Sequence, residues 1–378
     1  MRTPVEIFDD ACRTWGFNQA TRFFPIPDAL SGLFEGRRTL AQSQIAILSG
    51  LFRAGHKINI YVDFVDSGEL NAVADVRELW GLVGLLRGTV LLPLDMFSRM
   101  LAHPKVLPDI GDPSKESMHA QHTEGLVPDF DQLTASRRSA GQSPEPLSPV
   151  DPLRSRFASL AAEIAYDFLV LHELSHIMYG HCEYLQAKNG IPFILEVAHR
   201  SPTDAQDNRL RQAIEFHADK CSAHIGLSSM LSFSNEVPSA FAPIYSTPEQ
   251  RLFLWCFAIS GVFRLWGLRI DPSELDAEGY PPTALRFDMA MRVAHGMLRD
   301  KHPKLAAGFK TICHDAQDEL DSAVVQIGGN RLAREDVIHL NDARTDSHVR
   351  AVFRYANRTL VPALEKYSYL QFPKVEQQ

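Results

Sequence analysis

The chain has 378 residues, of which 45% are hydrophobic and 22% charged, as is typical of a folded globular protein. The formal net charge is −8, and no long basic run could follow a phosphate backbone, so we expect no nucleic-acid partner. The five cysteines are scattered, with no Cys-x-x-Cys pair, which argues against a disulfide framework. Residues 1–17 contain no apolar signal segment. We therefore expect a cytoplasmic protein.

The N-terminal part contains signals for strands. Residues 57–66 are rich in Ile, Val, Tyr and Phe, which predicts a partly buried strand. The apolar run at 79–86 suits a strand or a helix, and its glycines favour a strand. A short helix is expected at 94–101. Proline, serine and glycine punctuate residues 104–152, so we expect a long loop or a partly disordered insertion there.

The remainder of the chain is predicted to be helical. Apolar residues recur at helical spacing from Phe157 to Leu171, and the pattern of this buried helix ends at Asn189-Gly190. Further helices are expected at about 207–224, over the apolar run at 252, and at 306–326 and 351–367. The run at 252 ends at Arg264, well short of the roughly 20 residues that a membrane span needs, so we expect no membrane partner.

These elements predict a predominantly helical α+β fold. Its expected parts are an N-terminal α/β part at 1–103, an insertion at 104–153, a helical core at 154–303 and C-terminal helices at 304–378.

The most informative motif is His172-Glu173-Leu174-Ser175-His176. Two histidines four residues apart share one helix face, so both imidazoles can reach one Zn²⁺ ion, and Glu173 can contact the water that the ion activates. The alternative is an exposed helix turn that spells the motif by chance. The flanking Phe-Leu-Val-Leu and Ile-Met-Tyr segments are not those of a solvated helix, which favours a metal site in a buried helix.

A catalytic zinc needs a third protein ligand and an open position. The metzincin pattern fails, because Tyr179 and Cys182 occupy the positions that require Gly and His. His181 lies nine residues after His172, about 180° round a continuing helix, and is expected to face away as a helix-end residue. Glu215 and Asp219 are four apart, so one can bind zinc while the other accepts a ring N–H of a ligand histidine.

Residues 215–219 also allow interpretations without a metal. His217 lies about 200° round the helix from Glu215 and is expected to be a packing or surface residue. Glu215 and Asp219 could also belong to an ordinary solvated helix face.

The segment HELSHIMYGH followed by EFHAD resembles the gluzincin peptidases of the family that includes CAAX prenyl proteases and heat-shock membrane peptidases, and their soluble Lit-type phage-exclusion relatives. The resemblance implies a zincin-like core, zinc ligands at His172, His176 and Glu215, a further histidine at His181 and a supporting Asp219. Because this chain lacks the membrane spans of many relatives, the resemblance does not carry over their substrate class.

Two weaker matches extend the resemblance. The segment from Asn71 to Gly88 looks like the family's Asn-Ala segment and the edge strand that borders the active-site cleft. The segment from Tyr280 to Arg286 looks like its His-Pro-Pro segment with a following Arg, although Tyr280 stands where the family usually has His. Tyr280 could donate a hydrogen bond to an oxyanion, or it could be a turn residue before a helix start.

The predicted function is a soluble zinc-dependent endopeptidase acting on a protein or peptide substrate. Glu173 is the expected general base, with Tyr280 and Arg286 as further catalytic residues. Two alternatives remain, a catalytically inactive zinc-binding protein that acts through partners and a hydrolase of a non-peptide amide.

Overall fold

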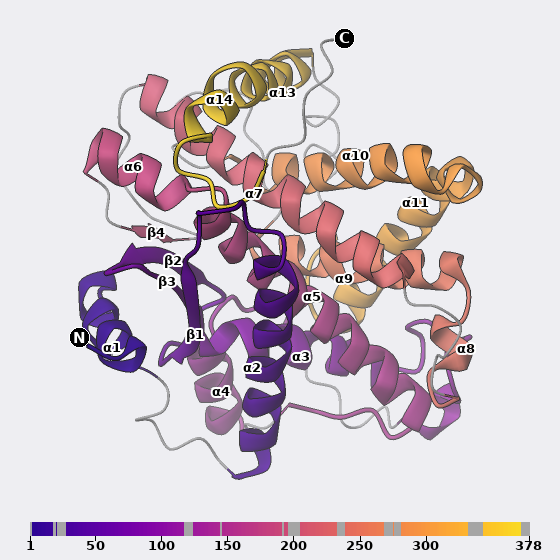
Figure 1. Cartoon of the computed structure of the whole chain (residues 1–378). Helices are drawn as coiled ribbons and strands as arrows, with labels where there is room; N and C mark the ends of the chain where they lie inside the picture. Colours follow the sequence, from indigo (N-terminus) through magenta and orange to yellow (C-terminus); the bar gives the residue numbers. More distant parts are fainter. Residues whose placement is uncertain are drawn as a thin grey trace.

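A four-stranded mixed sheet lies at one side of an otherwise mainly helical molecule, which confirms the α+β expectation (Figure 1). The computed structural model describes residues 2–17, 20, 28–116, 124–143, 146–190, 193–195, 205–232, 239–267, 275, 281–331 and 343–371.

The sheet has the strand order β1-β3-β2-β4. The first pair, β1 and β3, is parallel, whereas β2 runs antiparallel to both β3 and β4. The expected strand at 79–86 is therefore present as β3, but the prediction that it is an edge strand is wrong, because β1 and β2 bond to its two sides. The described strands are β1 (Asn59–Val65), β2 (Ala72–Arg77), β3 (Trp80–Leu86) and β4 (Phe193–Leu195).

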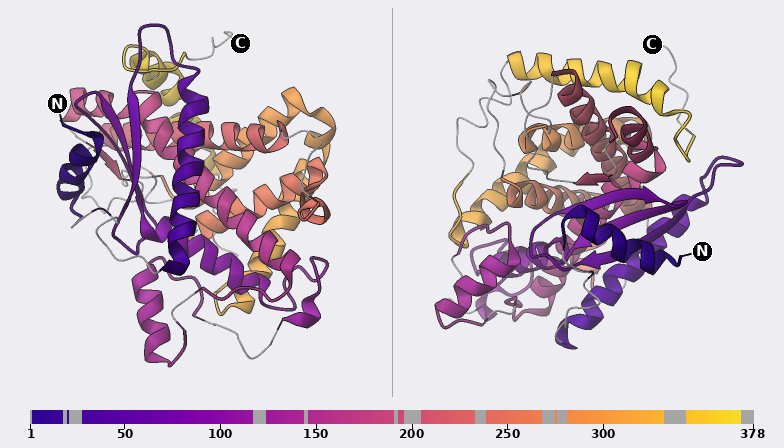
Figure 2. Two further views of the ribbon diagram at one scale, coloured as in Figure 1. Left: turned by 60° about the horizontal axis from the view of Figure 1, so that its bottom comes forward. Right: turned by 90° about the vertical axis from the view of Figure 1, so that its left-hand side faces the viewer.

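Helices cover both faces of this sheet. Successive side chains of a strand point to opposite faces, so the buried strand residues are divided between two hydrophobic cores. Helix α1 (Pro4–Trp15) buries Phe8 and Trp15 against one face, where Leu82 of β3 also packs. The other face packs on the main helical core. Figure 2 shows α1 on the side of the sheet away from that core. On the opposite face, Gly81 of β3 allows the helix that carries Ile177 to pack close to the sheet, since a Cβ at Gly81 would lie 2.6 Å from Ile177.

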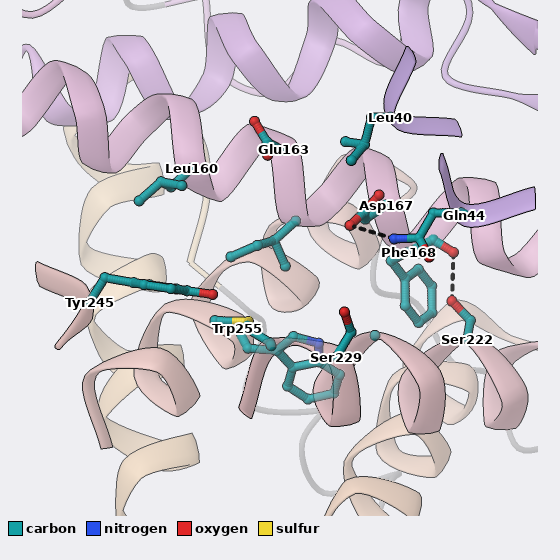
Figure 3. A pocket seen from close by; sticks show the side chains of 13 residues that line it. Leu40, Gln44, Leu160, Glu163, Asp167, Phe168, Ser222, Ser229, Tyr245 and Trp255 are labelled. Carbon is teal, nitrogen blue, oxygen red and sulfur yellow. Dashed lines mark hydrogen bonds between the residues drawn. The ribbon is translucent and has the colours of Figure 1, made fainter. Parts of the chain in front are cut away.

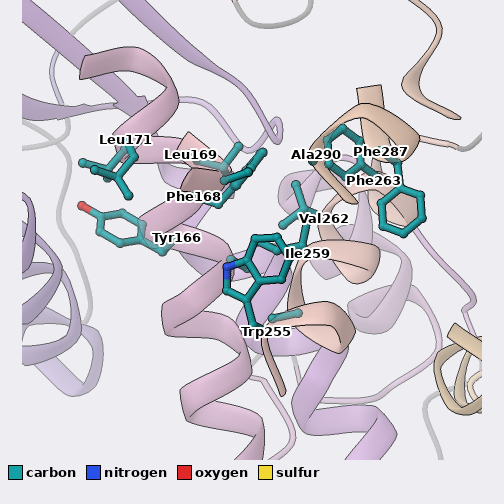
Figure 4. Close-up of a cluster of buried hydrophobic side chains, with 14 of the residues drawn as sticks. Tyr166, Phe168, Leu169, Leu171, Trp255, Ile259, Val262, Phe263, Phe287 and Ala290 are labelled. Carbon is teal, nitrogen blue, oxygen red and sulfur yellow. The ribbon is translucent and has the colours of Figure 1, made fainter. Parts of the chain in front are cut away.

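The helix α5 (Pro152–Met178) forms the centre of the helical core and carries the HExxH motif. It begins sharply because the Asp151 side chain accepts hydrogen bonds from the backbone N–H groups of Leu153 and Arg154, and Pro152 occupies the first turn. Its middle is buried against α9 (Pro248–Leu265), where Phe168 contacts Phe263, and Phe263 in turn contacts Phe287 of α10 (Thr283–Lys301) (Figure 4). The other helices are α2 (Asp28–Ser49), α3 (Arg87–Leu101), α7 (Ala205–Ser232), α8 (Ala242–Tyr245) and α11 (Pro303–Gln326).

The segment predicted as a loop or disordered insertion contains a helix, α4 (Phe130–Ser139), so the prediction is wrong over that range. Arg137 of α4 is fully buried and pairs with Asp95 of α3 at 2.7 Å. A second anchor is the buried guanidinium of Arg154, which donates hydrogen bonds to five backbone carbonyls between Leu101 and Ile110. Composition did not reveal these anchors, because single buried arginines hold the segment in place.

The predicted continuous helix from 157 to 189 is also wrong. Helix α5 ends at Met178, Gly180 adopts the left-handed conformation with φ 74°, and α6 (His181–Asn189) then starts in a new direction. A Cβ at Gly180 would lie 2.5 Å from Tyr367, so glycine is required there for close packing as well as for its φ.

At the C-terminus the expected helix at 351–367 is divided into α13 (Ala343–Tyr355), the π-helical turn η4 (Ala356–Leu360) and α14 (Val361–Leu364). No helix in the described ranges is both long and apolar enough to cross a membrane. All five cysteines are buried and free of disulfide bonds.

Candidate metal centre

Three side chains of the types that bind metals, from two helices, meet in the interior. His172 and His176 of α5 and Glu215 of α7 place one donor atom each within 4.8 Å of one another, and all three residues are buried. The two Nε2 atoms lie 2.9 Å apart, and Glu215 Oε2 lies 3.3 Å from Nε2 of His172. This group could hold a metal ion.

The positions of these ligands follow from helix geometry. Residues four apart lie one above the other on a helix, so His172 and His176 present both rings toward α7. The packing of α7 against α5 then brings Glu215 to the same point. Glu173, the residue after the first histidine, is only 1% exposed.

The donor set fits zinc. Zn–N bonds of 2.0–2.1 Å at a tetrahedral angle would place two ligand nitrogens about 3.3 Å apart, and the observed separation of 2.9 Å needs only a small side-chain adjustment. Two imidazoles and one carboxylate are also the ligand types of a zinc site that keeps a position open for water.

A carboxylate and an arginine support the first histidine. His172 Nδ1 lies 3.0 Å from Asp219 Oδ1, and Arg286 of α10 donates two hydrogen bonds of 2.8 Å to the two oxygens of Asp219. The positively charged guanidinium of Arg286 also lies 5.1 Å from the Trp266 ring centroid, within the range of a cation–π contact. Asp219 therefore faces a ligand ring on one side and a fixed positive charge on the other.

A chain of two further histidines supports the second ligand. His176 Nδ1 lies 3.0 Å from Nδ1 of His181, and His181 Nε2 lies 3.0 Å from Nδ1 of His217. Burial, with His176 as the next cause, lowers the pKa of His181 well below its usual value. Burial also lowers the pKa of His217 to about 3. Both rings are therefore neutral near pH 7.

Metal binding would fix which ring donates and which accepts in each of these histidine–histidine hydrogen bonds. A ligand His176 that offers Nε2 to the metal carries its proton on Nδ1, so it must donate to Nδ1 of His181. His181 then carries its proton on Nε2 and donates to Nδ1 of His217. Each ring in the series thereby fixes the tautomer and orientation of the ring before it.

The expectation was wrong for His181 but not for His217. His181 was expected to face away on a continuing helix, but the break at Gly180 turns it back onto His176. His217 was expected to be a packing or surface residue, and it is a buried packing residue, 6% exposed, whose Nδ1 lies 3.0 Å from Nε2 of His181. The sequence signal was Gly180 itself, since a glycine after a helical pattern commonly ends the helix.

The structure brings five of the predicted site residues together, while Tyr280 lies outside the described residues. The five are His172, His176, Glu215, Asp219 and Arg286. Arg286 contacts the supporting Asp219, and its Nη2 lies 3.9 Å from Oε2 of the ligand Glu215.

Comparison with known proteins adds no relative. No family model matches the chain, and no curated protein or solved structure matches it significantly.

Proposed function

We propose that the protein is a zinc-dependent endopeptidase. The observation that carries the proposal is the convergence of three buried ligands, His172, His176 and Glu215, with Glu173 placed directly after the first of them. Three protein ligands are the number that catalytic zinc sites use, whereas structural sites are usually closed by four. The resemblance of HELSHIMYGH and EFHAD to the gluzincin motifs supports the same reading.

In the proposed hydrolysis, the zinc ion and the protein side chains have separate tasks. Bound zinc would polarise the scissile carbonyl and lower the pKa of a water molecule toward about 7. Glu173 would take the proton from that water and return it to the leaving amine, because it is not itself one of the ligands. Asp219 and Arg286 hold the ring of His172, so they act by positioning.

The substrate strand would pair with a sheet edge other than β3, which is internal. Among the described strands, β1 and β4 end the sheet. Of these, β4 is the edge next to β2, which packs against the motif-bearing α5. An extended peptide added beside β4 would gain main-chain hydrogen bonds with little sequence preference.

The substitution Glu173→Gln tests this proposal. It should leave zinc content near one ion per chain, because Glu173 is no ligand, and lower turnover by about three orders of magnitude or more, because the amide cannot take a proton. The measurement is incubation of zinc-loaded wild type and variant with a proteome, followed by mapping of new N-termini.

The outcomes separate the alternatives. New N-termini that depend on Glu173 support the peptidase. Full zinc occupancy with no cleavage by the wild type would favour a partner-binding protein or a non-peptide amidase. Unchanged zinc content in a His172→Ala, His176→Ala variant would contradict the metal site itself.

A further inference from the structure

A cavity separate from the metal centre lies between α2, α5, α7, α8 and α9, with a volume of about 140 Å³. Its walls are largely apolar and aromatic, with Leu160, Phe168, Met230 and Trp255 among them. An engineered protein cavity of about 150 Å³ accepts benzene. The space is therefore large enough for a compact organic molecule and larger than a single water requires.

A carboxylate in the wall of the cavity has unused capacity to accept hydrogen bonds. Asp167 accepts one hydrogen bond through Oδ2, from Nε2 of Gln44 at 3.4 Å. Its Oδ1 is buried and has no hydrogen-bond partner among the described residues. Burial, followed by the charge of Glu163, raises the pKa of Asp167 to about 7. A positive group in the cavity would offset both effects and favour the ionised carboxylate.

Arg37, whose positive charge acts on Asp167, is already engaged in an ion pair. Arg37 pairs with Glu163 at 2.9 Å, and Arg37 does not line the cavity. The side chain of Glu163 is 46% exposed, so this ion pair lies toward the mouth while Asp167 lies deeper.

Two hydrogen-bond donors in the wall are already occupied. The Gln44 amide donates to Asp167, and the Ser222 hydroxyl donates to the carbonyl of Phe168 at 2.6 Å. The hydroxyl groups of Tyr245 and Ser229 point into the cavity and can accept (Figure 3). The two hydroxyls can donate as well as accept, so the feature that selects a ligand is the buried Oδ1 of Asp167, which needs a hydrogen-bond donor.

We propose that this cavity binds a small primary amine in its ammonium form, with a compact apolar body. An ammonium group has three donors and a positive charge, which match Asp167 and the hydroxyls of Tyr245 and Ser229. The hydrocarbon body would contact the apolar wall, and the Trp255 ring adds attraction for a nearby cation. The Tyr245 ring already has the guanidinium of Arg251 at 5.1 Å from its centroid.

The amine site is distinct from the metal centre although the same helices form both. Asp167 precedes His172 by five residues on α5, and Ser222 follows Asp219 by three on α7. None of the ligands or their supporting residues lines the cavity. The proposal therefore stands whether or not the protein is a peptidase.

Calorimetric titration with benzylamine and its neutral isostere benzyl alcohol tests the proposal at neutral pH. Wild type should bind benzylamine at least about tenfold more tightly, because a hydrogen bond to a charged group contributes more than one between neutral groups. Asp167→Asn should remove this preference. Glu163→Gln is the matched control and should retain most of it, because Arg37 already neutralises that carboxylate. A third ligand, N-acetyl-lysine methylamide, separates a free amine from a lysine of a peptide, and it should bind more weakly than benzylamine.

Four results would overturn the proposal. They are no saturable binding of benzylamine to wild type, equal affinity for the alcohol, an unchanged preference in Asp167→Asn, and equal losses in the two acid variants. The comparison of amine with alcohol needs only wild type, so it remains decisive if Asp167→Asn fails to fold. Tighter binding of the lysine derivative would assign the cavity to a peptide side chain instead.

Discussion

The two histidines of the candidate metal centre have partners of different charge. His172 faces Asp219, which Arg286 fixes by two hydrogen bonds, whereas His176 faces the neutral ring of His181. A carboxylate partner raises the basicity of a ligand ring, while a neutral acceptor mainly orients it. His181 should therefore contribute to metal affinity through geometry.

We predict that His181→Ala lowers zinc affinity by about 10- to 100-fold, as is common when the partner of a ligand histidine is removed. Competition with a chromophoric chelator measures the change. His181→Asn should recover part of the affinity, since its Oδ1 can accept from Nδ1 of His176. The control is His314→Ala, which removes a histidine that is 70% exposed. Equal affinities for wild type and His181→Ala would show that other contacts orient His176.

The sequence indicates the candidate ligands better than their partners. The spacing of His172 and His176 implies a shared helix face, because a helix has a fixed period. The same spacing left open whether Glu215 or Asp219 is the third ligand, and the family resemblance assigned Glu215. The contacts of His181 depend on a helix break and a change of chain direction. Helical periodicity cannot supply that direction, so residue spacing alone assigned His181 to the wrong side.

At the level of elements, the break between α5 and α6 depends on Gly180. We predict that Gly180→Ala destabilises the fold by about 2–4 kcal/mol, combining left-handed strain with overpacking, since its Cβ would lie 2.5 Å from Tyr367. Gly190→Ala is the matched control, because Gly190 is also left-handed but has no atom within 4 Å of a built Cβ. Denaturant unfolding of both variants gives the comparison, and equal losses would leave only backbone strain as the cause.

Helix α4 offers a second test at this scale. Arg137→Ala should cost about 3 kcal/mol, because it leaves the buried Asp95 with one fewer positive partner. The neighbouring Arg138 is exposed, and Arg138→Ala should change stability by no more than about 0.5 kcal/mol. Unfolding free energies of the two variants measure the difference. Similar small losses would mean that the 104–153 segment contributes little to the fold.

Element identity was easier to predict than element placement. The strands near 57–66 and 79–86 follow from local composition, but the sheet order depends on which strands meet. β2 begins at residue 72 and β4 at residue 193, so no local sequence pattern predicts that these two strands pair. The same holds for Arg137 and Asp95, which are 42 residues apart.

At the scale of the whole molecule, the candidate metal centre joins helices that are distant in sequence. Its three side chains that could bind a metal come from α5 and α7, and α10 is added through the contact of Arg286 with Asp219. An unfolded chain would not hold these groups together. Zinc bound only by the native state would therefore stabilise the entire fold by linkage.

We predict that zinc at 100 times its dissociation constant raises the free energy of unfolding by about 2.7 kcal/mol. Thermal unfolding with zinc or with a chelator measures this difference as a shift in Tm. Glu173→Gln should keep the full shift, because Glu173 is no ligand, whereas His172→Ala with His176→Ala should abolish it. These two variants separate metal binding from catalysis without any substrate. An unfolding temperature of wild type that is equal with zinc and with chelator would contradict a metal bound by the folded state.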